Sequence, residues 1–309
     1  MGYRFERDAS VQKNLRRIAL AQIDGAVASI DDHGLASGLV VHEVRKSCKK
    51  LRGLLRLVRP AFDFYARENA ALRDMASALS PLRDAAVLIE TYDALMDAHD
   101  GTVERATFAP VRRRLTLRQK ALDRDDSGAD RKLGEARDQL LAMRMRAGQW
   151  KLSGDDFSAL QHGLAKTYKR ARKAMKEADR SRDADAFHDW RKLVKYHGYH
   201  ARLMEPVWPA AMQAHRQCAD ALNDILGQHH DLAVFEDALR ETAAELRDAV
   251  DLAMLSAMIG QRQAALAERA FVTGARLFAE PADKLTQRWR RYWIEWRNDA
   301  TAAFAADAA

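Results

Sequence analysis

Hydrophobic residues recur at intervals of three and four along almost the whole chain. In the stretch VVHEVRKSCKKLRGLLRLVRP, from Val40 to Pro60, one face is apolar and the rest is polar. The apolar residues of this stretch are Val44, Cys48, Leu51, Leu54, Leu55 and Val58. A period near 3.6 residues indicates an amphipathic α-helix with one buried face. Using prolines, Asp-Gly and Ser-Gly as breaks, we predict helices over residues 9–31, 36–59, 62–79, 82–99, 103–124, 129–147, 154–180, 184–205, 208–226, 229–243, 246–278 and 282–305.

The composition favours an all-α fold class. Of the 309 residues, 48% are hydrophobic, which is enough for a core, and only 6 are proline and 15 glycine. The alternating Val/Ile/Thr runs that are typical of strands are absent. No run approaches the length of a membrane span, and MGYRFERDAS lacks the apolar core of a signal peptide. We therefore expect a cytoplasmic protein without a membrane partner.

The sequence contains an internal repeat. VHEVRKSCKKLRGLLRL, from Val41, is similar to FHDWRKLVKYHGYHARL, from Phe187, so that His42 matches His188 at an offset of 146 residues. Further on, LSPLRDAAVL is similar to LGQHHDLAVF, and Asp84 there matches Asp231. Two matches in the same order predict a duplicated unit. We expect a first half over residues 1–150 and a second half over 151–309, joined by a hinge over 149–156.

The polar face of the opening stretch carries almost one sign of charge. At 100° per residue, one basic stripe gathers on the side opposite the apolar face. This first stripe consists of His42, Arg45, Lys46, Lys49, Arg52 and Arg56. The repeat carries a second stripe, in which Gly198 replaces the counterpart of Arg52. The second stripe consists of His188, Arg191, Lys192, Lys195 and Arg202.

The same spacing of basic residues recurs on other predicted helices. A third set is Lys166, Lys169, Arg170 and Lys173, and shorter sets are Lys13, Arg16, Arg17 and Lys284, Arg288, Arg291. Like charges at these spacings destabilise a helix by a few tenths of a kcal/mol per pair. A polyanion would offset that cost, and the net charge of +7 agrees with an anionic partner.

Other interpretations of the stripes stay open at this point. Each could be a solvated face that pairs with carboxylates of neighbouring helices. The two motif histidines could bind a metal or accept a phosphate in an enzyme, although neighbouring cations disfavour a metal. A nucleic acid would also be attracted to a basic cleft. The sequence shows no Walker A loop, GxSxG, HExxH or helix-turn-helix signature, so we expect neither an enzyme nor a specific nucleic-acid partner.

The duplicated His-x-x-Arg-Lys spacing, with LRDAAVL at 82–88 and YKRARKA at 168–174, resembles the CHAD domain, the conserved histidine α-helical domain. The resemblance implies two related helical bundles about a pseudo-twofold axis, whose basic helices line a central cleft. It also implies binding of inorganic polyphosphate and association with polyphosphate granules, without a cofactor. Tyr196, Gly198 and His230 depart from the basic residues of the pattern.

We therefore predict a polyphosphate-binding protein whose contacts come from the two stripes, the third set and two arginines of the last short set. The predicted binding residues are His42, Arg45, Lys46, Lys49, Arg52, Arg56, Lys166, Lys169, Arg170, Lys173, His188, Arg191, Lys192, Lys195, Arg202, Arg288 and Arg291.

Overall fold

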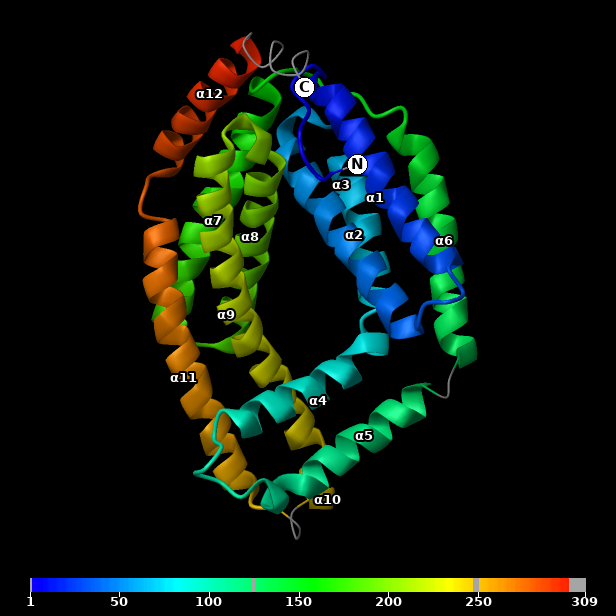
Figure 1. Cartoon of the computed structure of the whole chain (residues 1–309), viewed down its shortest axis with the longest axis vertical. Helices are drawn as coiled ribbons and strands as arrows, with labels where there is room; N and C mark the ends of the chain where they lie inside the picture. The colour runs from blue at the N-terminus through cyan, green and yellow to red at the C-terminus, as the bar shows by residue number, and fades with distance from the viewer. Residues whose placement is uncertain (1, 124–125, 247–249, 300–309) are drawn as a thin grey trace, which may run out of the picture.

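The computed structural model of the chain describes residues 2–123, 126–246 and 250–299, apart from the side chains of residues 82–84, 122, 123, 126 and 127. Every regular element within these residues is a helix, so the all-α prediction is confirmed (Figure 1). The first elements are α1 (Val11–Asp31), α2 (Ser37–Leu57), α3 (Tyr65–Ala78), α4 (Pro81–Asp97), α5 (Ala109–Asp123) and α6 (Asp126–Ala147). They are followed by α7 (Ser158–Ser181), α8 (Ala184–Leu203), α9 (Pro209–Glu241), α10 (Ala243–Leu246), α11 (Leu252–Leu277) and α12 (Ala282–Asn298). Short 3₁₀ helices are η1 (Arg59–Ala61), η2 (Arg105–Phe108) and η3 (Glu205–Val207).

Local sequence signals explain where several helices begin. The side chains of Ser10, Asp183 and Asp251 each accept a hydrogen bond from a backbone amide in the first turn of the helix that follows. Pro81 and Pro209 stand in the first turn of α4 and α9, where the missing amide proton costs nothing. The starts of α1, α4, α8 and α9 agree with those predicted from the sequence to within two residues, whereas α11 begins at Leu252 rather than at residue 246.

One predicted break is wrong. The segments 208–226 and 229–243 form a single helix, α9, which continues through Gly227. A Cβ added at Gly227 would lie 3.6 Å from Nη2 of Arg191, an ordinary contact distance, so the side chain of Arg191 on α8 packs beside this position. A glycine inside a helix costs about 1 kcal/mol relative to alanine but does not end α9. At the end of the chain, α12 ends at Asn298, and residues 300–305 of the last predicted helix lie outside the described residues.

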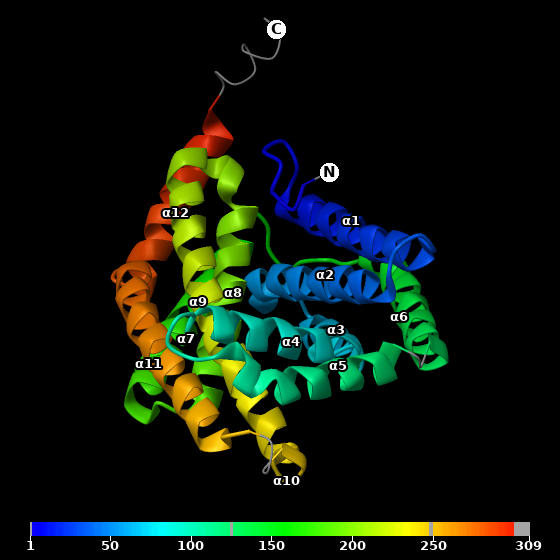
Figure 2. The ribbon, with the colours of Figure 1, turned by 60° about the horizontal axis from the view of Figure 1, so that its bottom comes forward.

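The helices form two groups on either side of a central space (Figure 1). One group contains α1, α2, α3 and α6; the other contains α7, α8, α9, α11 and α12. The groups meet where α2 contacts α8 and α7, and α4 forms a second connection, because it contacts α2 of the first group and α9 of the second. Viewed from the other direction, the end of α2 stands against α8 (Figure 2). At the second contact the buried rings of Tyr92 and Phe235 lie 6.3 Å apart, centroid to centroid.

Two glycines allow α2 to approach the second group closely. A Cβ added at Gly53 would lie 2.9 Å from Cδ2 of Tyr199 on α8, and the Nε2–H of His200 donates to the Gly53 carbonyl at 3.0 Å. A Cβ added at Gly163 on α7 would lie 1.9 Å from the carbonyl oxygen of Leu57. Any larger residue at 163 would push α7 off the end of α2.

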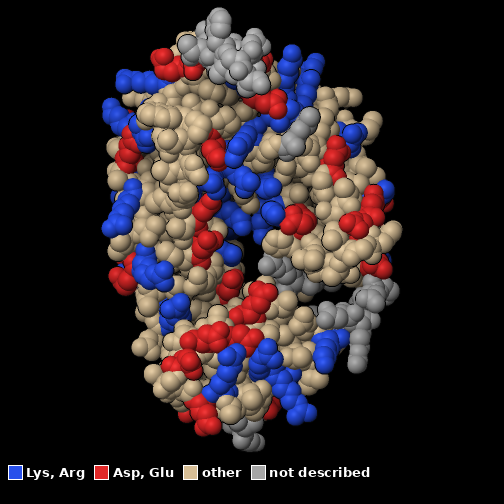
Figure 3. Space-filling view, in the orientation of Figure 1, with Lys and Arg blue, Asp and Glu red and all other residues tan. Residues whose placement is uncertain are grey.

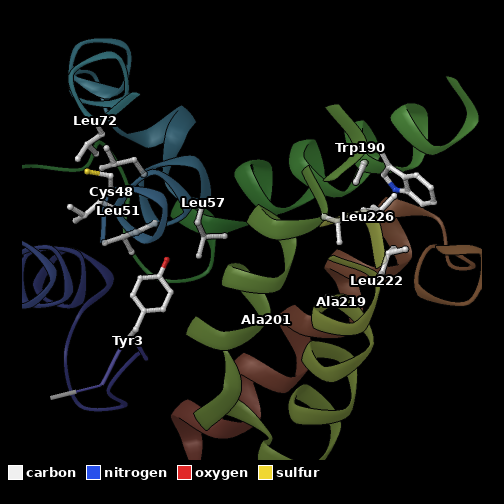
Figure 4. Packing of buried hydrophobic residues seen from close by; sticks show 14 of the residues in the cluster. Tyr3, Cys48, Leu51, Leu57, Leu72, Trp190, Ala201, Ala219, Leu222 and Leu226 are labelled. Carbon is white, nitrogen blue, oxygen red and sulfur yellow. The ribbon is translucent and has the colours of Figure 1, made fainter. Parts of the chain in front are cut away.

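Each group has its own apolar packing, and the two merge into one cluster of buried residues. Figure 4 shows Cys48, Leu51 and Leu72 together on one side and Trp190 and Leu226 together on the other. The predicted hinge falls between α6 and α7, and its backbone is hydrogen-bonded to the first group at several points. For example, Ser153 N donates to Ala61 O at 2.9 Å.

In the described part of the chain, no helix is long and apolar enough to span a membrane.

The order of elements follows the spacing of the sequence repeat. The first residues of α7, α8 and η3 follow those of α1, α2 and η1 by 147, 147 and 146 residues. The correspondence then changes, because α9 occupies the place that α3 and α4 share in the first part of the chain. The repeated helices α2 and α8 are the ones that carry the two histidine motifs.

Candidate functional site

Lys and Arg side chains gather about a hollow at the centre of one face of the molecule (Figure 3). We call the space between α2, α8, α9 and α4 the central hollow. The positive side chains lie where α2 approaches α8, and acidic side chains border the opening on the side of α9 and α4. The two edges of the hollow therefore differ in the sign of their charge.

The first part of α2 carries His42 and Lys46 of the first stripe, with side chains 39% and 44% exposed. Glu43 pairs with Lys46 at 3.0 Å, and its Oε1 lies 3.9 Å from Nε2 of His42. The single carboxylate of the opening stretch thus offsets part of the charge of this stripe. Both basic side chains stay exposed enough to contact an anion.

Arg45, by contrast, is tied into the fold. Its Nη1 donates to the Ala76 carbonyl at 3.1 Å and also to the Ser80 hydroxyl, at the end of α3. The carbonyls in the last turn of a helix lack donors within that helix, so the guanidinium supplies a hydrogen bond that the helix itself cannot provide. The side chain of Asp84, which the sequence suggests as an arginine partner, lies outside the described residues.

Two arginines of the first stripe stack against one tyrosine of α8. The guanidinium of Arg56 lies 4.3 Å from the ring centroid of Tyr196, and that of Arg52 lies 5.7 Å from it. Arg52 also donates to Asn69 Oδ1 at 3.2 Å, and burial lowers its pKa. Tyr196, which the sequence marks as a departure from the basic pattern, is therefore a platform for basic residues of the other group.

Basic residues of α7 continue the first stripe. Arg56 and Arg59 share a small surface hollow with Lys166 and Arg170. Sequence reasoning left out Arg59 because it follows the end of α2. We call the exposed side chains Lys166, Lys169, Arg170 and Lys173 the α7 face. Among the residues that the structure describes, no carboxylate forms an ion pair with any member of this face.

The second stripe is packed against α9. The ring of His188 stacks on that of His230 with centroids 4.1 Å apart. Burial first, and then Lys192 and Arg191, lower the pKa of His188; burial and the same neighbours lower that of His230 to about 3. The Arg191 guanidinium lies against Gly227, and Lys192 pairs with Asp189 at 2.5 Å.

The surroundings of Gly198 and Arg202 differ from those that their angular positions around α8 suggest. Gly198 is buried against α9, where an added Cβ would lie 3.5 Å from Oδ1 of Asp220 and 3.6 Å from Cβ of Ala219. Arg202 is exposed beside Lys50, whose pKa is lowered by burial, then by Arg202 and Lys46. Lys50 is thus a second cation that the sequence analysis missed, because it lies at the edge of the first stripe.

Residues of α12 lie apart from this arrangement. Helix α12 stands on the outer side of α7, away from α2, in both views (Figures 1 and 2). Arg288 there pairs with Glu280 at 2.7 Å, which raises its pKa. The structure therefore does not bring Arg288 and Arg291 together with the two stripes. Their spacing resembled the other basic sets, but helical spacing alone cannot show which way a helix faces in the fold.

Buried histidines of the second group form structural contacts. His197 and His215 share an Nε2–Nε2 hydrogen bond of 2.7 Å beside Trp289. His200, also buried, contacts α2 through Gly53. Burial lowers the pKa of His200 to about 3 and that of His215 to about 4. Within the described residues, no three His, Cys, Asp or Glu side chains come together as a metal-binding group.

The chain is similar to known proteins over most of its length. The chain is 30% identical over 247 residues to uncharacterized proteins from two strains of Mycobacterium tuberculosis. The matched region covers 74% of this chain and 45% of each relative. Residues 21–240 match the profile of the CHAD domain, and this match includes both stripes and the α7 face. The chain therefore belongs to the CHAD domain family.

Proposed function

We propose that this protein binds inorganic polyphosphate in the central hollow, through basic residues of α2 and α8. The observation that carries the proposal is that two stripes far apart in the sequence belong to helices that meet at one crossing, beside a hollow where Lys and Arg gather. In this proposal, residues 1–150 and 151–309 are two related halves of one domain, arranged with pseudo-twofold symmetry around a basic cleft. Binding, rather than catalysis, is the role of the site.

Polyphosphate suits the chemistry of these side chains. Arg and Lys donate charge-assisted hydrogen bonds to non-bridging phosphate oxygens, and the planar guanidinium binds two oxygens at once. A linear polyanion also removes the repulsion between like charges on each stripe. His42 and His188 add donors when they are protonated. In a cell, a protein with such a site would be cytoplasmic and associate with polyphosphate granules.

A titration tests the proposal. Polyphosphates of defined length are titrated against the protein at two salt concentrations, and binding is measured by calorimetry. Because several phosphates are neutralised, the logarithm of affinity should fall steeply with the logarithm of salt concentration, by analogy with counterion release from nucleic acids. An affinity that does not change with salt concentration would contradict the electrostatic basis of the proposal.

Two controls separate polyphosphate binding from its rivals. DNA supplied at the same phosphate concentration should displace bound polyphosphate less well than free polyphosphate does, whereas equal displacement would mean that the site recognises phosphate charge alone. Incubation with polyphosphate should release no phosphate above the rate seen without protein, and metal analysis should find no stoichiometric metal. Phosphate release that depends on His42 or His188 would assign the site to an enzyme instead.

A further inference from the structure

Two positions of the sequence repeat meet twice at the crossing of α2 and α8, with different residues each time. At the offset of 146 residues that relates the two histidine motifs, Lys50 of α2 corresponds to Tyr196 of α8, and Arg56 corresponds to Arg202. Lys50 lies beside Arg202, and Tyr196 lies under the guanidinium of Arg56. One contact therefore joins two cations, whereas its counterpart joins a cation to an aromatic ring.

The contact between Lys50 and Arg202 is repulsive. Burial first, and then Arg202 and Lys46, lower the pKa of Lys50, because neighbouring cations disfavour its charged form. Two like charges repel, so this contact does not itself fix the two side chains against each other.

The contact at Tyr196 is attractive. The ring is buried, and the guanidinium of Arg56 lies 4.3 Å from its centroid, with that of Arg52 at 5.7 Å. The face of an aromatic ring attracts a cation through its quadrupole. Arg52 is held further by Asn69, whereas the buried Nε of Arg56 has no hydrogen-bond acceptor among the described residues. The ring, rather than a hydrogen bond to Nε, therefore orients Arg56.

We propose that Tyr196 is a positioning residue for phosphate binding, whose ring holds the guanidinium groups of Arg52 and Arg56 in place before a phosphate arrives. This inference rests on the proposed function. A planar guanidinium binds two phosphate oxygens at once only in a suitable orientation, and fixing that orientation beforehand reduces the entropy lost on binding. The ring at position 196 thus exchanges one positive charge for two oriented ones, supplied by the other group of helices.

The test replaces the ring in three ways. Tyr196→Phe keeps the ring, Tyr196→Leu keeps an apolar side chain without it, and Tyr196→Lys introduces the residue type that Lys50 has at the corresponding position. Each protein is titrated with tripolyphosphate and with long-chain polyphosphate by calorimetry at several salt concentrations. The arginine Nε–H signals of the ligand-free proteins are recorded by NMR, and circular dichroism melting checks the fold.

The phenylalanine variant should bind both probes within about twofold of the unmodified protein, because the ring face is retained. The leucine variant should bind both about tenfold more weakly, because its arginines must be ordered on binding. The lysine variant should bind more weakly than the phenylalanine variant even at low salt, although its charge is higher by one. In the ligand-free proteins, the Arg56 Nε–H should show a ring-current shift that only the leucine and lysine variants lose.

The outcomes separate this inference from the proposed function. If the unmodified protein binds neither probe, both fail. If it binds both and the leucine variant equals the phenylalanine variant, the ring only fills the core and this inference alone is wrong. Tighter binding by the lysine variant than by the phenylalanine variant would show that Tyr196 merely replaces a cation. The ring-current shift in the unmodified protein does not depend on any variant folding, and its absence would also overturn the inference.

Discussion

Helices α2 and α8 present the same residue types at the same spacing, but their surroundings differ. On α2, His42 is 39% exposed and Lys46, 44% exposed, pairs with the neighbouring Glu43. On α8, the matching His188 is half-buried under His230, and burial lowers its pKa. The helix that covers α8 is α9, 33 residues long, whereas α3 beside α2 has only 14. A duplicated motif thus acquires two environments when one copy is covered by a longer helix.

This difference predicts that α2 and α8 contribute unequally to ligand binding and to stability. The stripe of α2 carries more basic residues, because Gly198 thins the stripe of α8, and it should therefore dominate ligand binding. Helices α8 and α9 hold most of the buried titratable groups. The largest expected consequence concerns stability rather than affinity.

Acid should destabilise the second group of helices before the first. His200, His215, His229 and His230 have pKa values lowered to about 3 or 4, and all four lie on α8 or α9. An unfolded histidine titrates near 6.5, so stability is complete above about pH 6.5 and is lost as pH falls toward 4. With about 1.4 kcal/mol per pKa unit, the total loss should reach several kcal/mol.

Hydrogen exchange at pH 7 and pH 5 measures this. Amides of α8 and α9 should lose protection at the lower pH, while those of α1 and α2 keep theirs. Simultaneous loss throughout the molecule would show that the two groups unfold as one unit.

Removing charge should affect α2 more than α8. Lys46→Gln with Lys49→Gln should weaken long-chain polyphosphate binding about a hundredfold, whereas Lys192→Gln with Lys195→Gln should weaken it about tenfold. Arg45 and Arg191 are left unchanged, because both are packed against neighbouring helices. Calorimetric titration of the two variants gives the comparison. Equal losses would contradict the unequal roles, and wild-type affinity in both would move the site away from these helices.

Binding should also depend on pH through the motif histidines. A phosphate beside imidazole favours its charged form, so the bound pKa exceeds the free one and a proton is taken up on binding. The free pKa of His188 is lowered, which makes it neutral near pH 7 before the ligand arrives. Affinity should rise about threefold from pH 8 to pH 6, and His42→Gln with His188→Gln should abolish most of that rise. Retention of the full rise in this double variant would exclude both histidines as contacts.

The smallest effect on binding is expected at Gly198. The sequence suggests that an arginine there would complete the second stripe, but the position is packed against Asp220 and Ala219 of α9. Gly198→Arg should cost about 1–3 kcal/mol of stability through overpacking and change affinity less than about twofold. Gly198→Ala should fold normally, because its Cβ would make ordinary contacts. A clear gain in affinity from the arginine would show that position 198 faces the ligand.

The sequence predicts the helices and their charged faces well, because both depend on local periodicity. It identified the stripe of α2 and the opposite apolar face, whose residues Val44, Cys48 and Leu51 lie buried. It could not identify the neighbours of each face, since those depend on packing between distant segments. The sequence marked Tyr196 as the loss of a cation, whereas the structure places the guanidinium of Arg56, from the other group, above its ring. The sequence also predicted a break between residues 226 and 229, whereas α9 continues through them. Arg288 had the right spacing but belongs to a helix on the outer side of the bundle.

The contact between Tyr92 and Phe235 has a consequence for what can enter the hollow. These two rings, fully buried, join α4 to α9 at the end opposite the α2–α8 crossing. With both ends held by buried side chains, widening the aperture requires exposing aromatic surface to water, which is unfavourable. In the proposed binding mode, the width of the ligand is therefore limited by two residues that do not contact it. Substitutions in this aromatic pair would therefore alter the width of the opening, and with it the polymers that fit the hollow, while every basic residue stays in place.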